Sequence, residues 1–455
     1  MIHLRRVEAG RASTLAPVRG DGKRRHGLAV GLAAAVVLAA PGAATADPSF
    51  DAARAPGPDL PFASSGPAAE RTSARPISGG ELERRLGELA SRASGASGYY
   101  VYDLGAKRKP VLFDRDEGDR RKLASNEKLF TTATALELLG PKSRIDTRVK
   151  IDGEVLASGR LKGDLYLIGG GDPSLGPAGL DDLAGDVRRA GVKRISGVVY
   201  GDDSVFDRLR GVPDSNFGPS QYIAPLSGLV YAGSTYAEDP ALAAAKAFRD
   251  ELRDASIAVD GKVKVEALPG KLRGEPEIAS YASETITSLA AATNKPSNNF
   301  YAEMLLKRVA AFKGKTGTTR DGVRIVERFA KSVGSKVDAK DGSGLTDGNK
   351  SSPRDVVDLL IAAAGDTEIG KPLFASLSIA GKDGTLDERM EGTPAAGKCR
   401  GKTGTISGVS NLSGYCKSGG DLVAFSILMN GVGDFTGARA IQDDMVVEIA
   451  KYRRR

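Results

Sequence analysis

The stretch LASNEKLFTTATALELLG, residues 123–140, carries Ser125 and Lys128 at the start of a helical pattern. We predict a helix over residues 125–139, closed by Gly140 and the proline that follows it. Because residues i and i+3 share one face of a helix, the Ser125 hydroxyl and the Lys128 amine can point into one cleft. The helix N-terminus would also offer free backbone N–H groups to a developing oxyanion. On its own the spacing is a weak signal, and a surface lysine is the alternative interpretation.

Two more motifs give this pair a chemical context. Ser297 and Asn299 form an S-x-N pattern at a predicted loop-to-helix junction, and Lys402, Thr403 and Gly404 form K-T-G on a predicted strand. The order S-x-x-K, S-x-N, K-T-G is typical of serine β-lactamases and penicillin-binding proteins. Three motifs in this order, each in its required structural context, are much more specific than any one of them.

A second K-T-G triplet begins at Lys315, only 18 residues after Ser297. It lies between two helical patterns, which leaves no room for an intervening sheet element. The copy at Lys402 is followed instead by two strand-like stretches. We therefore choose Lys402 and predict that the first copy is a loop.

Histidine usage restricts the possible chemistry further. The two histidines of the chain, His3 and His26, both precede residue 47. Without them the remaining chain cannot form a Ser-His-Asp triad, a Cys-His pair or a histidine zinc site. Proton transfer must then come from Lys, Asp, Glu or Tyr side chains. We predict no metal and no organic cofactor.

Residues 1–46 have the pattern of a secretory signal peptide. Basic residues precede an apolar run over residues 28–40, and residues 44–46 offer a small-x-small cleavage site. The run of 13 residues is shorter than the roughly 20 that a membrane-spanning helix needs, so an uncleaved anchor is the weaker alternative. We predict export to the periplasm or cell envelope, by a general secretory or a twin-arginine route. Residues 47–80, rich in Pro, Ala and Ser, are predicted to be a flexible linker.

The net charge of +8 is concentrated in this signal peptide. Residues 1–46 hold seven Lys/Arg and two Asp/Glu, which leaves 58 basic minus 55 acidic residues, or +3, for the remainder. Such a balance argues against a nucleic-acid-binding protein, whose basic residues concentrate on one face. The terminal residues 453–455, all Arg, are predicted to be a frayed, solvated helix end with at most peripheral membrane contact.

The two cysteines, Cys399 and Cys416, lie at equal distances from a predicted turn at residues 407–408. The flanking residues 398–404 and 409–416 have strand-like patterns. A hairpin that turns there places the two cysteines opposite each other, within reach of a disulfide. We predict this cross-strand disulfide, with two buried free thiols as the alternative.

The chain between the first two motifs has a different pattern of predicted secondary structure from the rest of the chain. Short β runs alternate with helical patterns over residues 144–280, which indicates a separate α/β domain. We predict that this domain is inserted into a catalytic domain formed by residues 81–143 and 281–455. The predicted fold class is α/β (α+β).

These residues resemble the D-alanyl-D-alanine carboxypeptidase/endopeptidase family of low-molecular-mass penicillin-binding proteins, in the class with a large insert between the first two motifs. Here Ser125 and Ser297 are 297 minus 125, or 172, residues apart. Further matching stretches are GDLYLIGGGDPSLG, GDDSVFD, PSNNFYAEML, DGSGLTDGN, AGKDGTLDERMEGTPAAG and GKTGTISGVSNLSGY. The resemblance implies a transpeptidase-like core, with helices around an antiparallel sheet, of the kind that serine β-lactamases share. One departure is that the segment between Pro225 and Pro240 is shorter than is usual in the family.

The resemblance also implies a mechanism. Ser125 would attack the carbonyl between two D-alanines, with Lys128 as the base. Burial and nearby Lys402 would lower the pKa of Lys128. Ser297 would relay a proton to the leaving amine, and Asn299 would hold the substrate amide and Lys128. The substrate-binding residues would be Lys402, Thr403, Gly404 and Thr405, with the backbone N–H groups of Ser125 and Thr405 as the oxyanion hole.

The implied substrates are peptidoglycan stem peptides, and the implied inhibitors are β-lactam antibiotics. Two other functions fit the same residues. One is a β-lactamase-like hydrolase that deacylates penicillin quickly, against which the large insert argues. The other is a catalytically idle scaffold that binds peptidoglycan, against which the intact motif residues argue.

Overall fold

The computed structural model describes residues 75–234 and 237–454. The predicted signal peptide, residues 1–46, and nearly all of the predicted linker lie outside the described residues. The last residues of that linker belong to the fold, because Ile77 forms an isolated parallel bridge with Tyr452 and helix α1 spans Gly79–Ser91.

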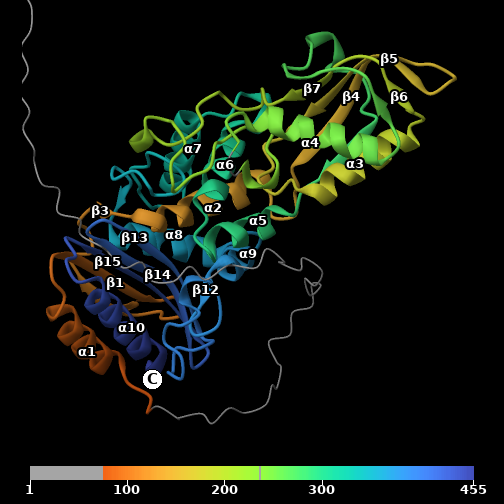
Figure 1. Cartoon of the computed structure of the whole chain (residues 1–455). Helices are drawn as coiled ribbons and strands as arrows, with labels where there is room; N and C mark the ends of the chain where they lie inside the picture. Colours follow the sequence, from red (N-terminus) through yellow and green to blue (C-terminus); the bar gives the residue numbers. More distant parts are fainter. Residues whose placement is uncertain (1–74, 235–236, 455) are drawn as a thin grey trace, which may run out of the picture. The chain divides into compact units, whose positions relative to one another are not determined.

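A six-stranded antiparallel sheet forms the centre of the fold (Figure 1). In spatial order its strands are β12 (Ser378–Ile379), β13 (Cys399–Ile406), β14 (Val409–Ser418), β15 (Asp421–Asn430), β1 (Ala96–Asp103) and β2 (Val111–Arg115). Two-residue turns at residues 407–408 and 419–420 join β13 to β14 and β14 to β15. Gly408 and Gly419 supply the positive φ that such tight turns require. The predicted hairpin is therefore confirmed.

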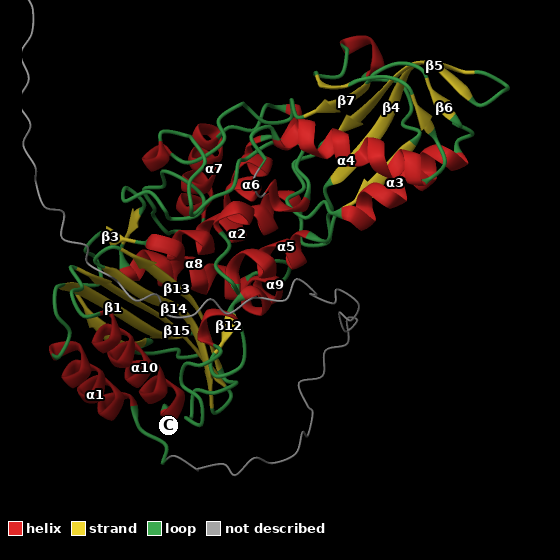
Figure 2. Cartoon of the chain, viewed as in Figure 1, coloured by secondary structure: helices red, strands yellow, loops and turns green. Residues whose placement is uncertain are grey.

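Helices cover both faces of this sheet (Figure 2). On one face, α1 and α10 (Phe435–Lys451) pack together, with Leu82 and Leu86 in the same apolar core as Met445. On the other face, α8 contacts the sheet directly and further helices extend the layer. These helices are α2 (Glu127–Leu139), α5 (Ile286–Asn294), α6 (Asn299–Ala310), α7 (Thr319–Ser332), α8 (Pro353–Gly365) and α9 (Gly370–Ser376). Because it is covered on both faces, β14 is buried along nearly its whole length.

The predicted arrangement of helices around an antiparallel sheet is thus confirmed. Within residues 75–234 and 237–454, no helix combines the length and the apolarity that are needed to cross a membrane.

Between α2 and α5 the chain builds a second, mixed sheet. Its strands are β4 (Asp146–Val155), β5 (Arg160–Ile168), β6 (Arg194–Ile195), β7 (Val199–Asp202), β8 (Ala258–Val259), β9 (Val263–Val265) and β10 (Ala279–Ala282). Helices α3 (Pro177–Arg189) and α4 (Pro240–Asp254) pack against it around an apolar core of their own. Residues 203–234, which follow β7, are largely irregular, with short 3-10 turns at Pro213–Ser215 and Ala232–Ser234.

The first K-T-G triplet lies in a loop and takes no part in the central sheet. Its Gly317 forms an isolated parallel bridge with Phe206 of the irregular segment. The Gly317 N–H donates to the Val205 carbonyl at 2.8 Å, and the Asp207 N–H donates to the Gly317 carbonyl at 3.0 Å. A side chain at residue 317 would collide with Phe206, so glycine allows this close approach. The triplet therefore joins the α6–α7 connection to the segment that follows β7.

The C-terminal arginines are not a frayed end, which corrects the prediction for residues 453 and 454. Arg454 forms ion pairs with Asp103 and Asp421. The Arg453 guanidinium donates to the Ser418 hydroxyl at 2.7 Å. Both arginines are held because α10 ends beside β1 and the β14–β15 turn, where these acceptors are buried or partly buried.

Cys399 and Cys416 face each other on β13 and β14 and form a disulfide. The prediction made from their equal distances to the turn is confirmed. Both residues are buried in the core beneath α10.

Replacing both cysteines by serine should lower the free energy of unfolding by about 3 kcal/mol, because the crosslink spans 17 residues and restricts the unfolded chain. Urea unfolding of the C399S/C416S protein beside the wild type measures this difference. Thiol titration of the unfolded, unreduced wild type should find no free thiol. Two titratable thiols, or equal unfolding midpoints, would contradict the prediction.

Candidate active site

Ser125 lies just before the helix in which it was expected. It belongs to a 3-10 turn, Ala124–Asn126, and α2 begins at Glu127. Ala124 has a positive φ of 45°, a backbone conformation that is uncommon for a residue with a side chain. Lys128 is in the first turn of α2, and its Nζ lies 2.9 Å from the Ser125 Oγ. The S-x-x-K spacing therefore brings the two groups together although Ser125 is not α-helical.

A neighbouring loop packs closely against the backbone of Ala124. Gly344, with φ 82°, packs so closely that a Cβ on it would lie 1.8 Å from the Ala124 carbonyl oxygen. Only glycine fits a position of this kind, because it has no Cβ and adopts a positive φ freely. The loop at residues 341–344 is thereby pressed against the backbone that carries Ser125.

Lys128 is fully buried and has three polar neighbours. Besides the Ser125 hydroxyl, its Nζ contacts the Asn299 Oδ1 at 2.8 Å and the Ser343 carbonyl oxygen at 2.6 Å. The sequence indicated Asn299 but not Ser343, whose stretch DGSGLTDGN has the composition of a turn. The only signal for that loop was its match to the family.

Burial determines the electrostatics of both lysines in the motifs. It lowers the pKa of Lys128 to about 7, although the carboxyl groups of Asp341 and Glu303 act in the opposite direction. Lys402 is also fully buried, and burial together with the nearby charge of Lys128 lowers its pKa well below the usual value.

The K-T-G residues lie on β13, directly against the turn that holds Ser125. The Lys402 Nζ donates to the Thr403 carbonyl at 2.9 Å, and the hydroxyls of Thr403 and Thr385 are 2.9 Å apart. A Cβ at Gly404 would lie 2.7 Å from the Leu123 carbonyl oxygen, so this glycine lets the strand approach the turn.

The S-x-N residues lie where the chain enters α6. The Asn298 side chain caps the helix by accepting from the Tyr301 N–H at 3.1 Å, and Asn299 is the first helical residue. Ser297 has a positive φ of 61°, a conformation that is uncommon for a serine. The middle residue of the motif thus has a structural role, and its two neighbours lie on the cleft side.

A cavity of about 760 Å³ is lined by residues of the first two motifs and by Thr405, which directly follows the K-T-G triplet. Its lining includes Ser125, Ser297, Asn299 and Thr405, while Lys128 and Lys402 are not part of the lining. The other residues that line it are Val212, Asp214, Ser215, Ser220, Tyr222, Leu345, Asp347, Ile406 and Ser407. The irregular segment after β7 therefore forms one wall of the cavity.

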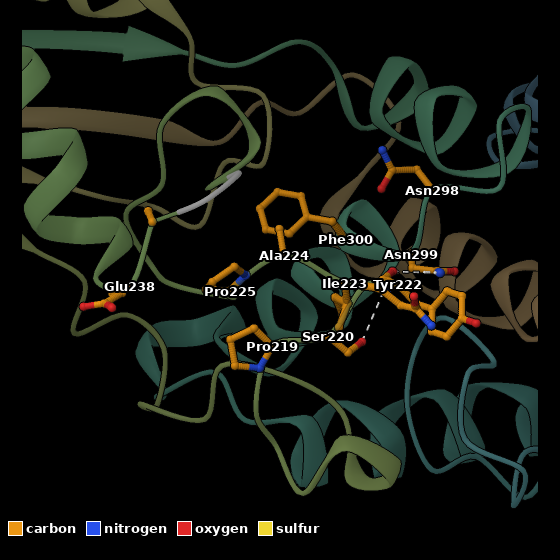
Figure 3. Close-up of a pocket in the computed structure, with 12 residues that line it drawn as sticks. Pro219, Ser220, Tyr222, Ile223, Ala224, Pro225, Glu238, Asn298, Asn299 and Phe300 are labelled. Carbon is orange, nitrogen blue, oxygen red and sulfur yellow. Dashed lines mark hydrogen bonds between the residues drawn. The ribbon is translucent and has the colours of Figure 1, made fainter. Parts of the chain in front are cut away.

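One residue of that segment contacts the S-x-N motif directly (Figure 3). The Asn299 Nδ2 donates to the Tyr222 carbonyl at 3.0 Å. Tyr222 lies in a tight turn in which Ser220 and Ile223 exchange backbone hydrogen bonds. A second hollow of about 560 Å³ adjoins this turn and shares Ser220, Tyr222 and Asn299 with the first. The sequence carried no signal for this contact, because a backbone carbonyl supplies it.

Among the described residues, no group of three or more His, Cys, Asp or Glu side chains could hold a metal ion. A cavity-lining serine in contact with a buried lysine, beside a K-T-G strand on a helix-flanked antiparallel sheet, is the arrangement of penicillin-binding proteins and serine β-lactamases. This is the class of protein that the fold and the site define.

Comparison with known proteins identifies the family within this class. The family described as D-Ala-D-Ala carboxypeptidase 3 (S13) matches residues 88–238 and 232–452. The chain belongs to this family.

Relatives and solved structures agree with this membership. A D-alanyl-D-alanine carboxypeptidase of Actinomadura sp. (strain R39) is 31% identical, over 78% of this chain and 81% of that protein. Carboxypeptidase DacB of Mycolicibacterium smegmatis is 29% identical, over 90% of this chain and 89% of that protein. The crystal structure of penicillin binding protein 4 from Haemophilus influenzae has a TM-score of 0.69 at 21% identity, covering 79% of this chain and 97% of that one. This likeness establishes the fold.

Proposed function

We propose that the chain is a serine-type D-Ala-D-Ala carboxypeptidase and endopeptidase that acts on peptidoglycan stem peptides through an acyl-enzyme on Ser125. The observation that carries the proposal is the set of three contacts made by the Lys128 Nζ. Family membership and the carboxypeptidase names of its relatives support the same reaction.

The contacts of Lys128 favour its action as a general base. A neutral amine has two N–H bonds and one lone pair. The Asn299 Oδ1 and the Ser343 carbonyl oxygen are both acceptors, so they take the two N–H bonds. The lone pair then faces the Ser125 Oγ, 2.9 Å away, which is within reach for proton transfer. A pKa of about 7 leaves a large fraction of the amine neutral near neutral pH.

The reaction begins when the Ser125 Oγ bonds to the carbonyl carbon between two D-alanines and its proton passes to Lys128. The C–N bond then breaks as a proton reaches the leaving D-alanine amine through Ser297. Water hydrolyses the resulting ester and restores the Ser125 hydroxyl. If the carbonyl belongs to a cross-link between glycan strands, the same steps cut that cross-link.

Substrate groups are proposed to bind as the motifs suggest. Lys402 and Thr403 would hold the terminal carboxylate, which would also stabilise the charged form of the buried lysine. The backbone N–H groups of Ser125 and Thr405 would form the oxyanion hole. Gly404 would keep β13 close to Ser125, and Asn299 would bind the substrate amide. A β-lactam would use the same groups, in keeping with the β-lactam complex solved for the Haemophilus influenzae protein.

We also propose the domain organisation and the location that were predicted from the sequence. Residues 1–46 would be a signal peptide that is removed on export to the periplasm or cell envelope, where peptidoglycan lies. Residues 144–280 would be a domain inserted into the catalytic one, which the separate sheet and apolar core of this region support.

The purified chain from residue 47 onward should release one D-alanine from a synthetic stem pentapeptide and gain the mass of one penicillin. A slowly hydrolysed adduct is expected, because the cavity is arranged for acylation and the family is named for peptidases. D-alanine chromatography and intact-mass spectrometry measure the two results. Penicillin consumed without an adduct would favour a β-lactamase, and neither reaction would favour the scaffold.

A further inference from the structure

The carboxyl group of Glu303 is fully buried one helical turn after Asn299 on α6. We propose that Glu303 is a positioning residue that fixes the Ser343 carbonyl as an acceptor for Lys128 and so directs the Lys128 lone pair at Ser125. The inference rests on the proposed role of Lys128 as the base. It concerns a residue that belongs to none of the three motifs.

Glu303 holds the loop at residues 341–344 through two hydrogen bonds. Its Oε1 accepts from the Gly342 N–H at 2.8 Å and from the Ser343 N–H at 2.7 Å. The Gly342 carbonyl accepts in turn from the Thr131 hydroxyl at 2.8 Å. The peptide unit between Gly342 and Ser343 is thus held at its N–H by α6 and at its carbonyl by α2.

The next peptide unit carries the acceptor itself. Its carbonyl, from Ser343, accepts from Lys128, and its N–H, from Gly344, donates to the Asp341 Oδ1 at 2.7 Å. Both ends of this unit are therefore occupied, and its orientation follows from that of the preceding unit. Loss of the Glu303 acceptor would free the loop to rotate the Ser343 carbonyl away from Lys128.

The position of Glu303 on α6 links the two acceptors of Lys128. Residues 299 and 303 are four apart and share one face of the helix. Asn299 offers its Oδ1 to Lys128 directly, and Glu303 acts through the backbone of the loop. A single rigid helix therefore sets both N–H directions of the amine, and hence the direction of the remaining lone pair.

Hydrogen bonding rather than charge is the property of Glu303 that this role needs. Burial raises the pKa of Glu303 to about 8, which favours the neutral form of the carboxyl. Its Oε2 has no hydrogen-bond partner among the described residues. A glutamine amide would keep the accepting oxygen in place, whereas alanine would leave two buried N–H groups without an acceptor.

The test measures acylation of the full chain by a chromogenic β-lactam, with the acylation rate constant separated from the dissociation constant of the preceding complex. Glu303→Ala should lower the rate constant by about 100-fold, the lower end of what a positioned base contributes. The dissociation constant should stay unchanged, because Glu303 does not line the cavity. Glu303→Gln should restore a rate close to that of the wild type.

A second pair of variants keeps the test decisive if Glu303→Ala does not fold. Thr131→Val removes the hydroxyl that holds the Gly342 carbonyl, and it should slow acylation several-fold with an unchanged dissociation constant. Thr134→Val is the matched control, because its buried hydroxyl on the same helix donates only to the Phe130 carbonyl. It should acylate at the wild-type rate.

Three results would overturn the proposal: a wild-type rate in folded Glu303→Ala, a Glu303→Gln protein as slow as Glu303→Ala, or equal rates for Thr131→Val and Thr134→Val. Failure of the proposed function looks different, because the wild type itself would then not be acylated.

Discussion

A Ser125→Ala protein should form no covalent adduct with penicillin and should release D-alanine at least about 10⁴-fold more slowly than the wild type. The acyl-enzyme needs an oxygen nucleophile, and Ser125 supplies the hydroxyl that Lys128 contacts at 2.9 Å in the cavity. Intact-mass spectrometry measures the adduct, and chromatography measures the released D-alanine. The melting temperature should change little, because only one oxygen atom at the cavity surface is lost.

Ser407→Ala is the matched control for this substitution. Ser407 lines the same cavity but lies in the turn between β13 and β14, and no role in the reaction is proposed for it. It should be acylated at the wild-type rate. A stable adduct on the Ser125→Ala protein would place the nucleophile elsewhere, with Ser297 as the next hydroxyl to replace.

The second large effect is expected at Lys128. Lys128→Met keeps the length of the buried side chain but removes the amine, and acylation should fall about 10³-fold, within the range of a positioned general base. The dissociation constant of the initial β-lactam complex should not change, because Lys128 does not line the cavity. Stopped-flow kinetics separate the two constants. Lys295→Met, which removes the Nζ that pairs with Asp383, is the control and should acylate normally.

The pH dependence of acylation gives the same prediction a second readout. Only the deprotonated amine accepts a proton, so the wild-type rate should rise with pH through about 7, where Lys128 titrates. The Lys128→Met protein should lack this rise. A rate that is flat from about pH 5.5 to 8.5 in the wild type would show that Lys128 is not the base.

Elements with local signals could be predicted from the sequence. The apolar spacing of α2 and its Gly-Pro end are visible within one stretch, and the two-residue turn sets the β13–β14 register and thus the disulfide. The 3-10 turn at Ser125 could not be predicted in this way. It depends on the positive φ of Ala124 and on the packing of Gly344, which is distant in sequence and leaves no trace in helical periodicity.

The motif residues of the site could be predicted, but the groups that orient them could not. Ser343 and Tyr222 act through backbone carbonyls, which have no signature in the side-chain sequence. Glu303 lies on a helix among apolar neighbours, where a carboxyl suggests a surface position until its two N–H partners are known. Such contacts join segments more than 30 residues apart, so only the tertiary structure brings them together.

The strand order of the central sheet determines when during synthesis the protein can become active. β1 is made early but pairs with β15, close to the end of the chain, and β13 with its K-T-G residues is also made late. A growing chain therefore contains Ser125 and Lys128 long before it can build the cavity around them. Closing a loop of this length is also slow, because chain entropy must be lost before the strand contacts form. A chain that ends before β13 therefore lacks the residues Thr405, Ile406 and Ser407 that complete the cavity around Ser125.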